Sequence, residues 1–283
     1  MMILVVGATG NVGREALDLL AAEEIPARAL TRYPGKAAPP PGIVAVGGDL
    51  TRPETLPAAF AGVDEVFLIL AATVDLPAQR LAAILRMAVD AGVRRLVLVS
   101  SISAATAPGN AVGRRHLELE QAVRECGLAW TFLRPGMFMS NALDWAASIR
   151  SDGMVRAGYG DLTTSPTDPA DIAAVGVTAL LTDGHEGRIY PLSGPAEISP
   201  REQVRVLGEV LGRPIRFEEL SPVAFRRQLH SHAPPAVVDA MLAMLTSPTG
   251  GLSEVLPTVP EVLGRPARTF EQWAGTHAEL FRS

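Results

Sequence analysis

Three glycines near the start of the chain limit what it can fold into more than any other feature. In VVGATGNVGR (5–14), Gly7, Gly10 and Gly13 recur at intervals of three, directly after the apolar run Ile3–Val6. The stretch that follows, NVGREALDLLAAE, has apolar residues three or four positions apart, which is the period of a helix. The pattern predicts a strand, a tight turn and a helix, with a ligand lying close to the turn backbone where side chains are absent.

The same alternation continues through the first half of the chain. Short and nearly continuous apolar runs lie at 26–30, 42–47, 63–70, 94–100 and 128–133, and stretches of helical period separate them. Continuous apolar strands are typical of a sheet covered by helices on both faces. Strands that alternate with helices indicate a parallel sheet. We therefore predict an α/β fold, a doubly wound parallel sheet of the Rossmann type, over residues 1–150.

After about residue 150 the sequence changes character. A loop-rich segment is followed by the helical DIAAVGVTALLTD, the strand-like GRIYPLSG and several further helices. In SPREQVRVLGEVLG, a serine followed by proline predicts the first turn of a helix. We predict a smaller, mostly helical lobe over residues 151–283, with some sheet and helix returning to the first domain. A substrate would lie between this lobe and one end of the sheet.

Composition excludes several classes of partner. The net charge is −5 and the pI about 5.6, and no basic stretch is long enough to follow a nucleic-acid backbone. The longest apolar stretch, VFLILAATV, is about half of a membrane span. The single cysteine, Cys126, fits a reducing compartment and is expected to be a packing thiol. We expect a cytoplasmic monomer or homodimer that binds neither nucleic acid nor membrane.

The glycine spacing suits a dinucleotide pyrophosphate. Binding of this group requires backbone N–H groups and a helix N-terminus that face it, with no Cβ at the points of close approach. Gly7 would make the turn, Gly10 would admit the phosphates, and Gly13 would let the helix pack on the strand. The sequence therefore predicts dinucleotide binding at the first βα turn.

The wider pattern resembles a known family. G-x-x-G-x-x-G with Thr9 before the middle glycine is similar to the fingerprint of extended and atypical short-chain dehydrogenase/reductases. GATGNVGR resembles the NmrA-like branch, which includes NAD(P)H:quinone reductases and non-catalytic redox sensors. The segments ALTR, GDL, AGVRRLVLVSS and HLELEQAVRECGLAWTFLRPGMFMSN also resemble segments of this family. The last third of the chain resembles the family in its general sequence character more than in specific motifs.

The end of the second predicted strand indicates which dinucleotide is bound. An NAD site places a carboxylate there for the ribose 2′-hydroxyl, but this chain has Thr31 and Arg32. A guanidinium at this point pairs with the 2′-phosphate of NADP, so NADP(H) is the expected cofactor. The alternative is that Arg32 is an ordinary solvated residue. By resemblance, Asp49 and Leu50 would contact the adenine, unless Asp49 only stabilises a turn.

The resemblance implies a cofactor site that spans the whole edge of the sheet. Its expected members are Gly7, Thr9, Gly10, Asn11, Val12, Gly13, Arg32, Asp49, Leu50, Ala71, Ser100, His116, Pro135, Gly136, Met137 and Phe138.

The usual catalytic pair of these reductases is missing. They carry Tyr-x-x-x-Lys on one helix, and here the matching positions hold Val112 and His116. Ser101 and His116 are the candidate catalytic residues, and His116 precedes Glu118 and Glu120 as in the quinone-reductase branch. A hydroxyl of Ser100 or Ser101 would bond a carbonyl or the nicotinamide ribose. The alternatives are a structural histidine and serines that only cap a strand end.

The resemblance also assigns a substrate wall. Phe138, Asn141 and Trp145 would face the substrate, or Phe138 and Trp145 are ordinary core residues. No metal site is expected, since HSH (230–232) lacks nearby ligands at metal spacing.

Together these features predict an atypical NADPH-dependent reductase of a quinone or a polycyclic aromatic ketone. Such acceptors accept hydride readily, so a phenolic acid is dispensable. The alternative is a non-catalytic NADP(H)-binding redox sensor that acts through a protein partner. An isomerase or epimerase is a third option, which the missing tyrosine disfavours.

Overall fold

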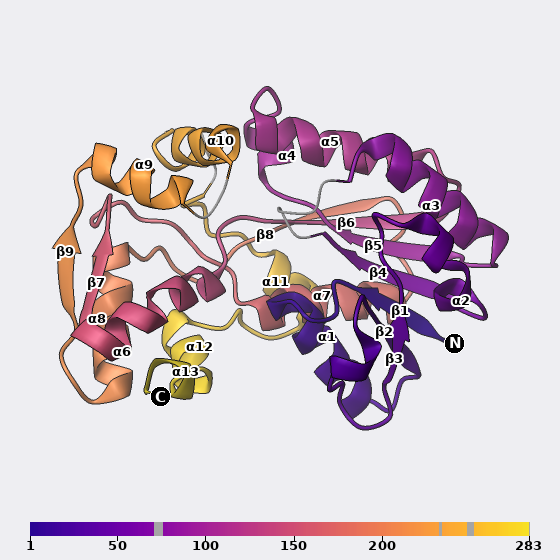
Figure 1. The fold of residues 1–283 in the computed structure, drawn as a ribbon, viewed down its shortest axis with the longest axis horizontal. Helices are drawn as coiled ribbons and strands as arrows, with labels where there is room; N and C mark the ends of the chain where they lie inside the picture. Colours follow the sequence, from indigo (N-terminus) through magenta and orange to yellow (C-terminus); the bar gives the residue numbers. More distant parts are fainter. Residues whose placement is uncertain (71–75, 232–233, 248–251, 283) are drawn as a thin grey trace.

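Seven parallel strands form one sheet, and a second lobe stands beside it in the computed structural model (Figure 1). The structure describes residues 1–70, 76–231, 234–247 and 252–282. In chain order the strands of the sheet are β1 (Ile3–Val6), β2 (Ala27–Thr31), β3 (Val44–Gly47), β4 (Glu65–Ile69), β5 (Arg95–Val99), β6 (Ala129–Pro135) and β8 (Arg188–Leu192). The predicted doubly wound parallel sheet is confirmed.

The order of the strands places the glycine turn at a special point. Across the sheet the order is β3-β2-β1-β4-β5-β6-β8, so the chain winds outward in one direction from β1 to β3 and in the other from β4 onward. In open α/β sheets, ligands bind where this direction reverses, beyond the carboxyl ends of the strands. The turn after β1 lies at that switch point.

Helices cover both faces of the sheet because alternate strand residues point to opposite sides. On one face Ile3, Val5 and Phe67 pack against α1 (Asn11–Ala22), α7 (Pro169–Leu181) and α11 (Thr258–Leu263). The other face is covered by α2 (Pro57–Phe60), α3 (Ala78–Asp90) and α5 (Ala111–Arg124). Short helical turns, η1 (Pro34–Lys36), η2 (Pro53–Thr55) and α4 (Ser103–Thr106), lie in the connections. The half-buried Cys126 packs against the second of these cores, and burial raises the pKa of its thiol.

The second lobe has its own apolar core. Trp273 and Phe281 are fully buried there, together with Ile149 and Leu207. Its elements are η3 (Met139–Trp145), α6 (Ala146–Asp152), β7 (Met154–Ala157), α8 (Pro200–Leu211), β9 (Arg216–Glu219), α9 (Pro222–His230), α10 (Pro235–Leu245), α12 (Phe270–Thr276) and α13 (Glu279–Arg282). As the sequence predicts, Ser199 caps α8, accepting a hydrogen bond from the N–H of Glu202, and Pro200 follows it.

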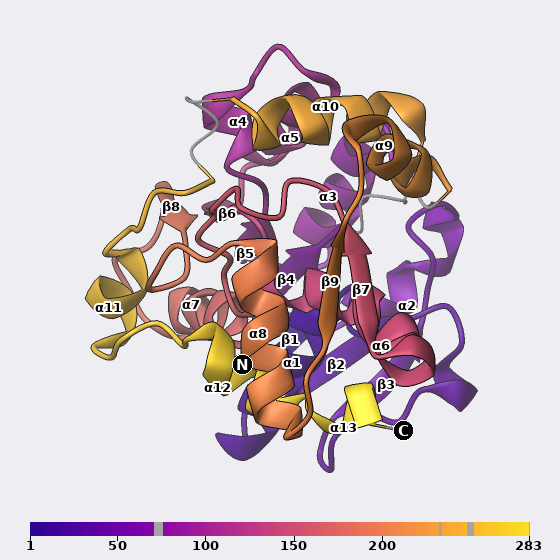
Figure 2. The ribbon, with the colours of Figure 1, turned by 90° about the vertical axis from the view of Figure 1, so that its left-hand side faces the viewer.

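Segments of the second half of the chain return to the first. Strand β8 pairs with β6, and α7 packs against α1. Figure 2 shows α10 lying beside α4 and α5, and the side chain of Asn110 donates to the carbonyl of Ala240 across this contact. The smaller lobe is therefore joined to the sheet by several crossings of the chain.

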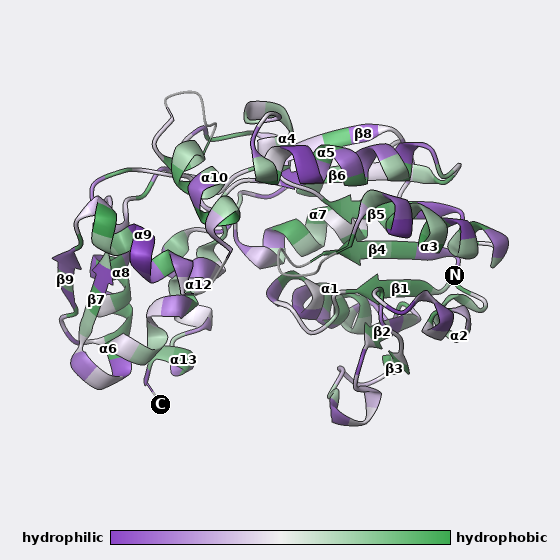
Figure 3. Cartoon of the chain, turned by 45° about the horizontal axis from the view of Figure 1, so that its top comes forward, coloured by the Kyte–Doolittle hydropathy of each residue, from purple (hydrophilic) through white to green (hydrophobic). Residues whose placement is uncertain are grey.

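The carboxyl ends of the strands face the second lobe. Figure 3 shows β1 and β4 pointing toward that lobe and colours most of their residues as hydrophobic. No described helix is both long and apolar enough to cross a membrane.

Tight packing of α7 on the sheet gives a test of this arrangement. An alanine Cβ at Gly176 would overlap the ring of Phe67, which is itself fully buried. We expect Gly176→Ala to lower the free energy of unfolding by ~1–3 kcal/mol in urea titrations.

Gly275 in α12 provides the matched control. No atom lies within 4 Å of a Cβ built there, so Gly275→Ala should raise the free energy of unfolding by ~0.5–1 kcal/mol. Equal effects of the two variants would contradict the packing of α7 described above.

Candidate dinucleotide and substrate site

The turn after β1 has the geometry that the glycine spacing predicts. Gly7 adopts a φ of +79°, and a Cβ there would overlap the carbonyl oxygen of Ile69. A Cβ on Gly13 would overlap the carbonyl oxygen of Gly7 and lie 2.8 Å from the Cα of Ala8. These two glycines therefore serve the turn itself and the packing of the helix on it.

Gly10 is different, because nothing in the fold requires the absence of its side chain. It is exposed, and a Cβ built there would meet only the carbonyl oxygen of Gly7, at 3.4 Å. Gly10 is also the N-cap of α1, whose first turn leaves N–H groups without intrahelical partners. Such N–H groups favour an anion, and binding of a pyrophosphate over them stays a prediction. Thr9 and Asn11 are exposed beside it, whereas the side chain of Val12 is buried in the core.

Positive charge gathers beyond the end of β2. The guanidinium of Arg32 lies 5.8 Å and the ammonium of Lys36 lies 5.7 Å from the ring centroid of Tyr33, which is 62% exposed. Both side chains are exposed. Sequence reasoning identified Arg32 but missed Lys36, whose approach depends on the short turn η1. A lysine four residues after the predicted arginine is the signal that was available.

The side chain of Asp49 forms hydrogen bonds within its own loop. Its Oδ1 accepts hydrogen bonds from the backbone N–H and the hydroxyl of Thr51, both at 2.8 Å. The N–H bond from Thr51 is the main reason that the pKa of Asp49 lies below its ordinary value. Leu50 is half-buried and packs against the core. The turn alternative for Asp49 therefore holds in this structure, and contact of Asp49 and Leu50 with adenine stays a prediction.

The two serines after β5 have different surroundings. Ser100 is buried, and its hydroxyl donates to Oε1 of Glu120 at 2.6 Å. The Ser100 hydroxyl thus donates its proton to a buried carboxylate, and the expected contact of this hydroxyl with the cofactor stays a prediction. Ser101 is half-buried, and its Oγ accepts from the hydroxyl of Ser103 at 2.8 Å. Ser101 therefore keeps its own hydroxyl proton available at the edge of the sheet.

His116 lies on α5 one turn after Val112, as the spacing of these two residues in the sequence predicts. Asn110 caps this helix, and its side chain accepts from the N–H of Gly113 at 2.7 Å. Nδ1 of His116 is buried without a hydrogen-bond partner among the described residues. Burial, followed by the neighbouring Arg115, lowers the pKa of His116 from 6.5 to about 4. A buried ring nitrogen without a partner is costly, so Nδ1 of His116 is an unsatisfied polar atom.

The segment after β6 is held by its backbone. The N–H of Gly136 donates to Leu192 at 3.2 Å, and the carbonyl of Met137 accepts from Thr167 at 2.7 Å. Pro135 is buried, and Met137 packs in a small cluster with Ile102, Met244 and Leu252. The predicted meeting of this backbone with a carboxamide stays a prediction.

The expected substrate wall divides into core and surface. Phe138 is half-buried against the core under α1 and α7, and Trp145 packs against the core of the second lobe. The core alternative is therefore favoured for both aromatic residues, while Asn141 is exposed. Ala71, which was expected near the cofactor, lies outside the described residues.

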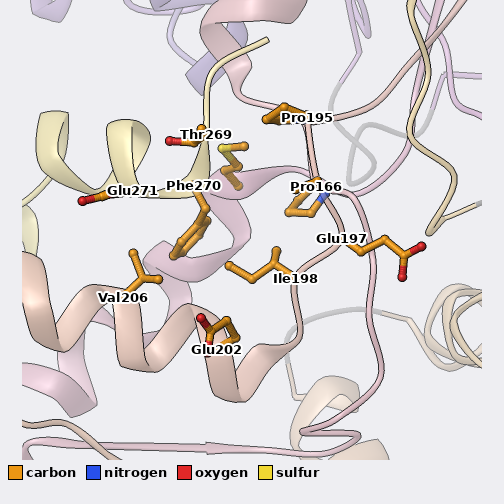
Figure 4. A pocket seen from close by; sticks show the side chains of 11 residues that line it. Pro166, Pro195, Glu197, Ile198, Glu202, Val206, Thr269, Phe270 and Glu271 are labelled. Carbon is orange, nitrogen blue, oxygen red and sulfur yellow. The ribbon is translucent and has the colours of Figure 1, made fainter. Parts of the chain in front are cut away.

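A separate hollow lies in the second lobe. Its volume is about 220 Å³, and its lining includes Met139, Ile198 and Phe270 between α8 and α12 (Figure 4). None of the predicted cofactor or substrate residues lines it. Nor do the described residues contain a group of three or more His, Cys, Asp or Glu side chains placed to hold a metal ion.

Comparison with known proteins agrees with this geometry. Residues 7–183 match the NAD(P)H-binding family. The chain is 46% identical to the (4-alkanoyl-5-oxo-2,5-dihydrofuran-3-yl)methyl phosphate reductase of Streptomyces griseus subsp. griseus, with 99% of each chain covered. It is 40% identical to the NAD(P)H azoreductase of Xenophilus azovorans, again with 99% of each covered. The chain belongs to the NAD(P)H-binding family.

A solved structure shares the fold of this NAD(P)H-binding protein. The NADPH-dependent quinone oxidoreductase of Escherichia coli, determined in complex with NADPH, matches with a TM-score of 0.79 at 26% identity. The match covers 98% of this chain and 99% of that chain. These findings confirm the predicted quinone-reductase-like family, the nicotinamide cofactor and the oxidoreductase class.

The openness of Gly10 makes a direct test of the phosphate cradle. In Gly10→Val the branched side chain would fill the space over the first turn of α1, so we expect loss of NADPH binding in a fluorescence titration. The thermal unfolding midpoint should stay close to that of the wild type, because a Cβ at this position meets little protein. Gly275→Val, at another exposed helical glycine, should bind NADPH normally. Normal binding by Gly10→Val would show that the turn is only structural.

The cations beyond β2 make a second test. In this NAD(P)H-binding protein, Arg32→Ala should weaken NADPH binding by ~10- to 100-fold through loss of a charge-assisted contact. Lys36→Ala should weaken it in the same direction by less, since an ammonium lacks the bidentate geometry of a guanidinium. NADH affinity is the internal control and should change in neither variant. If the wild type binds NADH and NADPH equally well, the assignment of Arg32 is wrong.

Proposed function

We propose that the protein is an NADPH-dependent reductase that transfers hydride to a conjugated, electron-poor acceptor such as a quinone or a polycyclic aromatic ketone. The acceptor would lie at the carboxyl edge of the sheet, under the second lobe. The observation that carries the proposal is the surface of α5 at Val112 and His116, where the usual phenol and ammonium are replaced by an apolar side chain and a neutral imidazole.

The residues of this site bind and orient better than they donate protons. With a pKa of about 4, His116 is neutral near pH 7, so it offers a hydrogen bond and not a readily released proton. The Ser101 hydroxyl is a second neutral donor. Neither group is an ionisable acid matched to neutral pH. Water is then the source of the proton that completes the reduction.

This chemistry suits acceptors in which the added charge is delocalised. Bound NADPH supplies the hydride, and the protein contributes position and a dry environment. General acid catalysis contributes only ~100- to 10,000-fold in rate. A reactive acceptor is therefore reduced without general acid catalysis, whereas a simple ketone is not.

The names of the relatives support this class of acceptor. One reduces an acylated unsaturated lactone that carries a phosphate, another is an azoreductase, and a third is a quinone oxidoreductase. Each of these names points to an unsaturated acceptor: an unsaturated lactone, an azo compound or a quinone. The relatives also favour turnover over the alternative of a sensor.

Turnover of a small panel tests the proposal. We expect NADPH oxidation with quinones and acylated unsaturated lactones, and none with simple aliphatic ketones. His116→Ala should slow turnover by ~10- to 100-fold without abolishing it, since the hydride donor stays in place. The turnover rate should also show no inflection from His116 between about pH 5 and pH 8, because its pKa is about 4.

The exposed His230 on α9 supplies the matched control for the histidine change. His230→Ala should leave the turnover rate unaltered. An inflection near pH 6.5 that disappears in His116→Ala would show that His116 acts as an ordinary acid, which contradicts the proposed mechanism. Tight NADPH binding with no turnover in the panel would favour the sensor instead.

A further inference from the structure

Glu120 on α5 is fully buried and is the centre of a charged network. Its Oε1 accepts from the hydroxyl of Ser100 at 2.6 Å and from Nε of Arg134 at 2.8 Å. Its Oε2 accepts from Nη2 of Arg134 at 2.6 Å and from Nη2 of Arg124 at 3.0 Å. The Arg134 pair is therefore bidentate. The family resemblance drew attention to Glu120 but gave no reason for it.

Burial of a carboxylate is unfavourable in free energy unless hydrogen bonds and opposite charges replace its lost hydration. Burial by itself raises the pKa of Glu120, but the hydrogen bonds from Arg134 and Ser100 hold it below the ordinary value. The side chain of Arg134 is only 12% exposed, so it depends on Glu120 in turn. Removal of one partner leaves the other charge buried and unpaired. The network thus fixes the relative positions of the elements that carry its members.

Those elements are the ones that carry the nicotinamide side of the predicted site. Ser100 directly follows β5 and precedes Ser101, while Arg134 lies near the end of β6 and precedes Pro135 and Gly136. His116 lies four residues before Glu120, hence on the same face of α5 one turn away. Glu120 holds all three elements together at the carboxyl edge of the sheet.

We propose that Glu120 is a positioning residue for hydride transfer: through Ser100 and Arg134 it fixes where His116 and the Pro135–Gly136 turn stand around the nicotinamide. This inference rests on the proposed function, because it places the nicotinamide at this edge. Glu120 itself touches neither the cofactor nor the acceptor. Its effect is on the orientation of the residues that do.

A second buried carboxylate separates positioning from simple stability. Glu65, the first residue of β4, is 5% exposed and pairs with Arg95 at 3.8 Å. It lies at the opposite edge of the sheet, where the strands begin. Loss of charge at Glu65 therefore perturbs a buried ion pair of the same sheet without reaching the site.

The experiment compares Glu120→Gln with Glu65→Gln. For each full-length variant we measure the thermal midpoint, the Kd for NADPH, the emission of bound NADPH, and kcat and KM with one quinone. We expect kcat of Glu120→Gln to fall by ~10- to 100-fold, with KM for the quinone changed less than about threefold. The emission of bound NADPH should shift, because the nicotinamide environment changes. Glu65→Gln should lower only the thermal midpoint.

Two outcomes decide the matter. If Glu120→Gln changes only the thermal midpoint, as Glu65→Gln does, Glu120 is a stability residue and the proposal is overturned. If the wild type reduces none of the acceptors but the emission of bound NADPH still shifts in Glu120→Gln, Glu120 positions the surroundings of the nicotinamide while the proposed reductase function fails. Should Glu120→Gln not fold, Arg134→Lys keeps the charge but loses the bidentate pair, and the same shifts are expected of it.

Discussion

The contact between the first turn of α1 and the turn after β1 is the constraint on which the site depends. Gly13 lies so close to the carbonyl of Gly7 that no side chain fits between them. This approach seats α1 on the sheet, where Val12 and Ala16 join the core. It also aims the helix N-terminus at the switch point between β1 and β4. A wider separation would turn the N–H groups away from a pyrophosphate.

The two ends of the site are built from opposite kinds of electrostatics. At the predicted adenosine end, Arg32 and Lys36 are solvated cations around an exposed ring, suited to a ligand that brings its own negative charge. At the predicted nicotinamide end, the buried carboxylate of Glu120 is paired with the guanidinium groups of Arg134 and Arg124.

The buried network around Glu120 holds in place the elements that carry the predicted nicotinamide end of the site. Functional side chains act best when they stand on rigid elements held by further hydrogen bonds. Here one carboxylate joins the ends of two strands to a helix by bonds of 2.6–2.8 Å. The rest of the site is fixed by backbone bonds, such as that from Gly136 to Leu192. In the proposed mechanism, these residues supply position more than proton transfer.

The sequence by itself determined the sheet, the glycine turn and the cofactor class, because each depends on local patterns. Apolar runs, helical periods and the close approach of Gly13 to Gly7 are set by residues near one another in the chain. The tertiary structure decided what depends on contacts distant in sequence. The Ser100 hydroxyl points inward because Glu120, twenty residues later, accepts a hydrogen bond from it. Phe138 and Trp145 are half-buried because the elements that pack against them come from distant parts of the chain. Lys36 joined Arg32 through a turn that no periodic pattern encodes. A side chain's partner is chosen by which elements the fold brings together, and a linear pattern does not contain that choice.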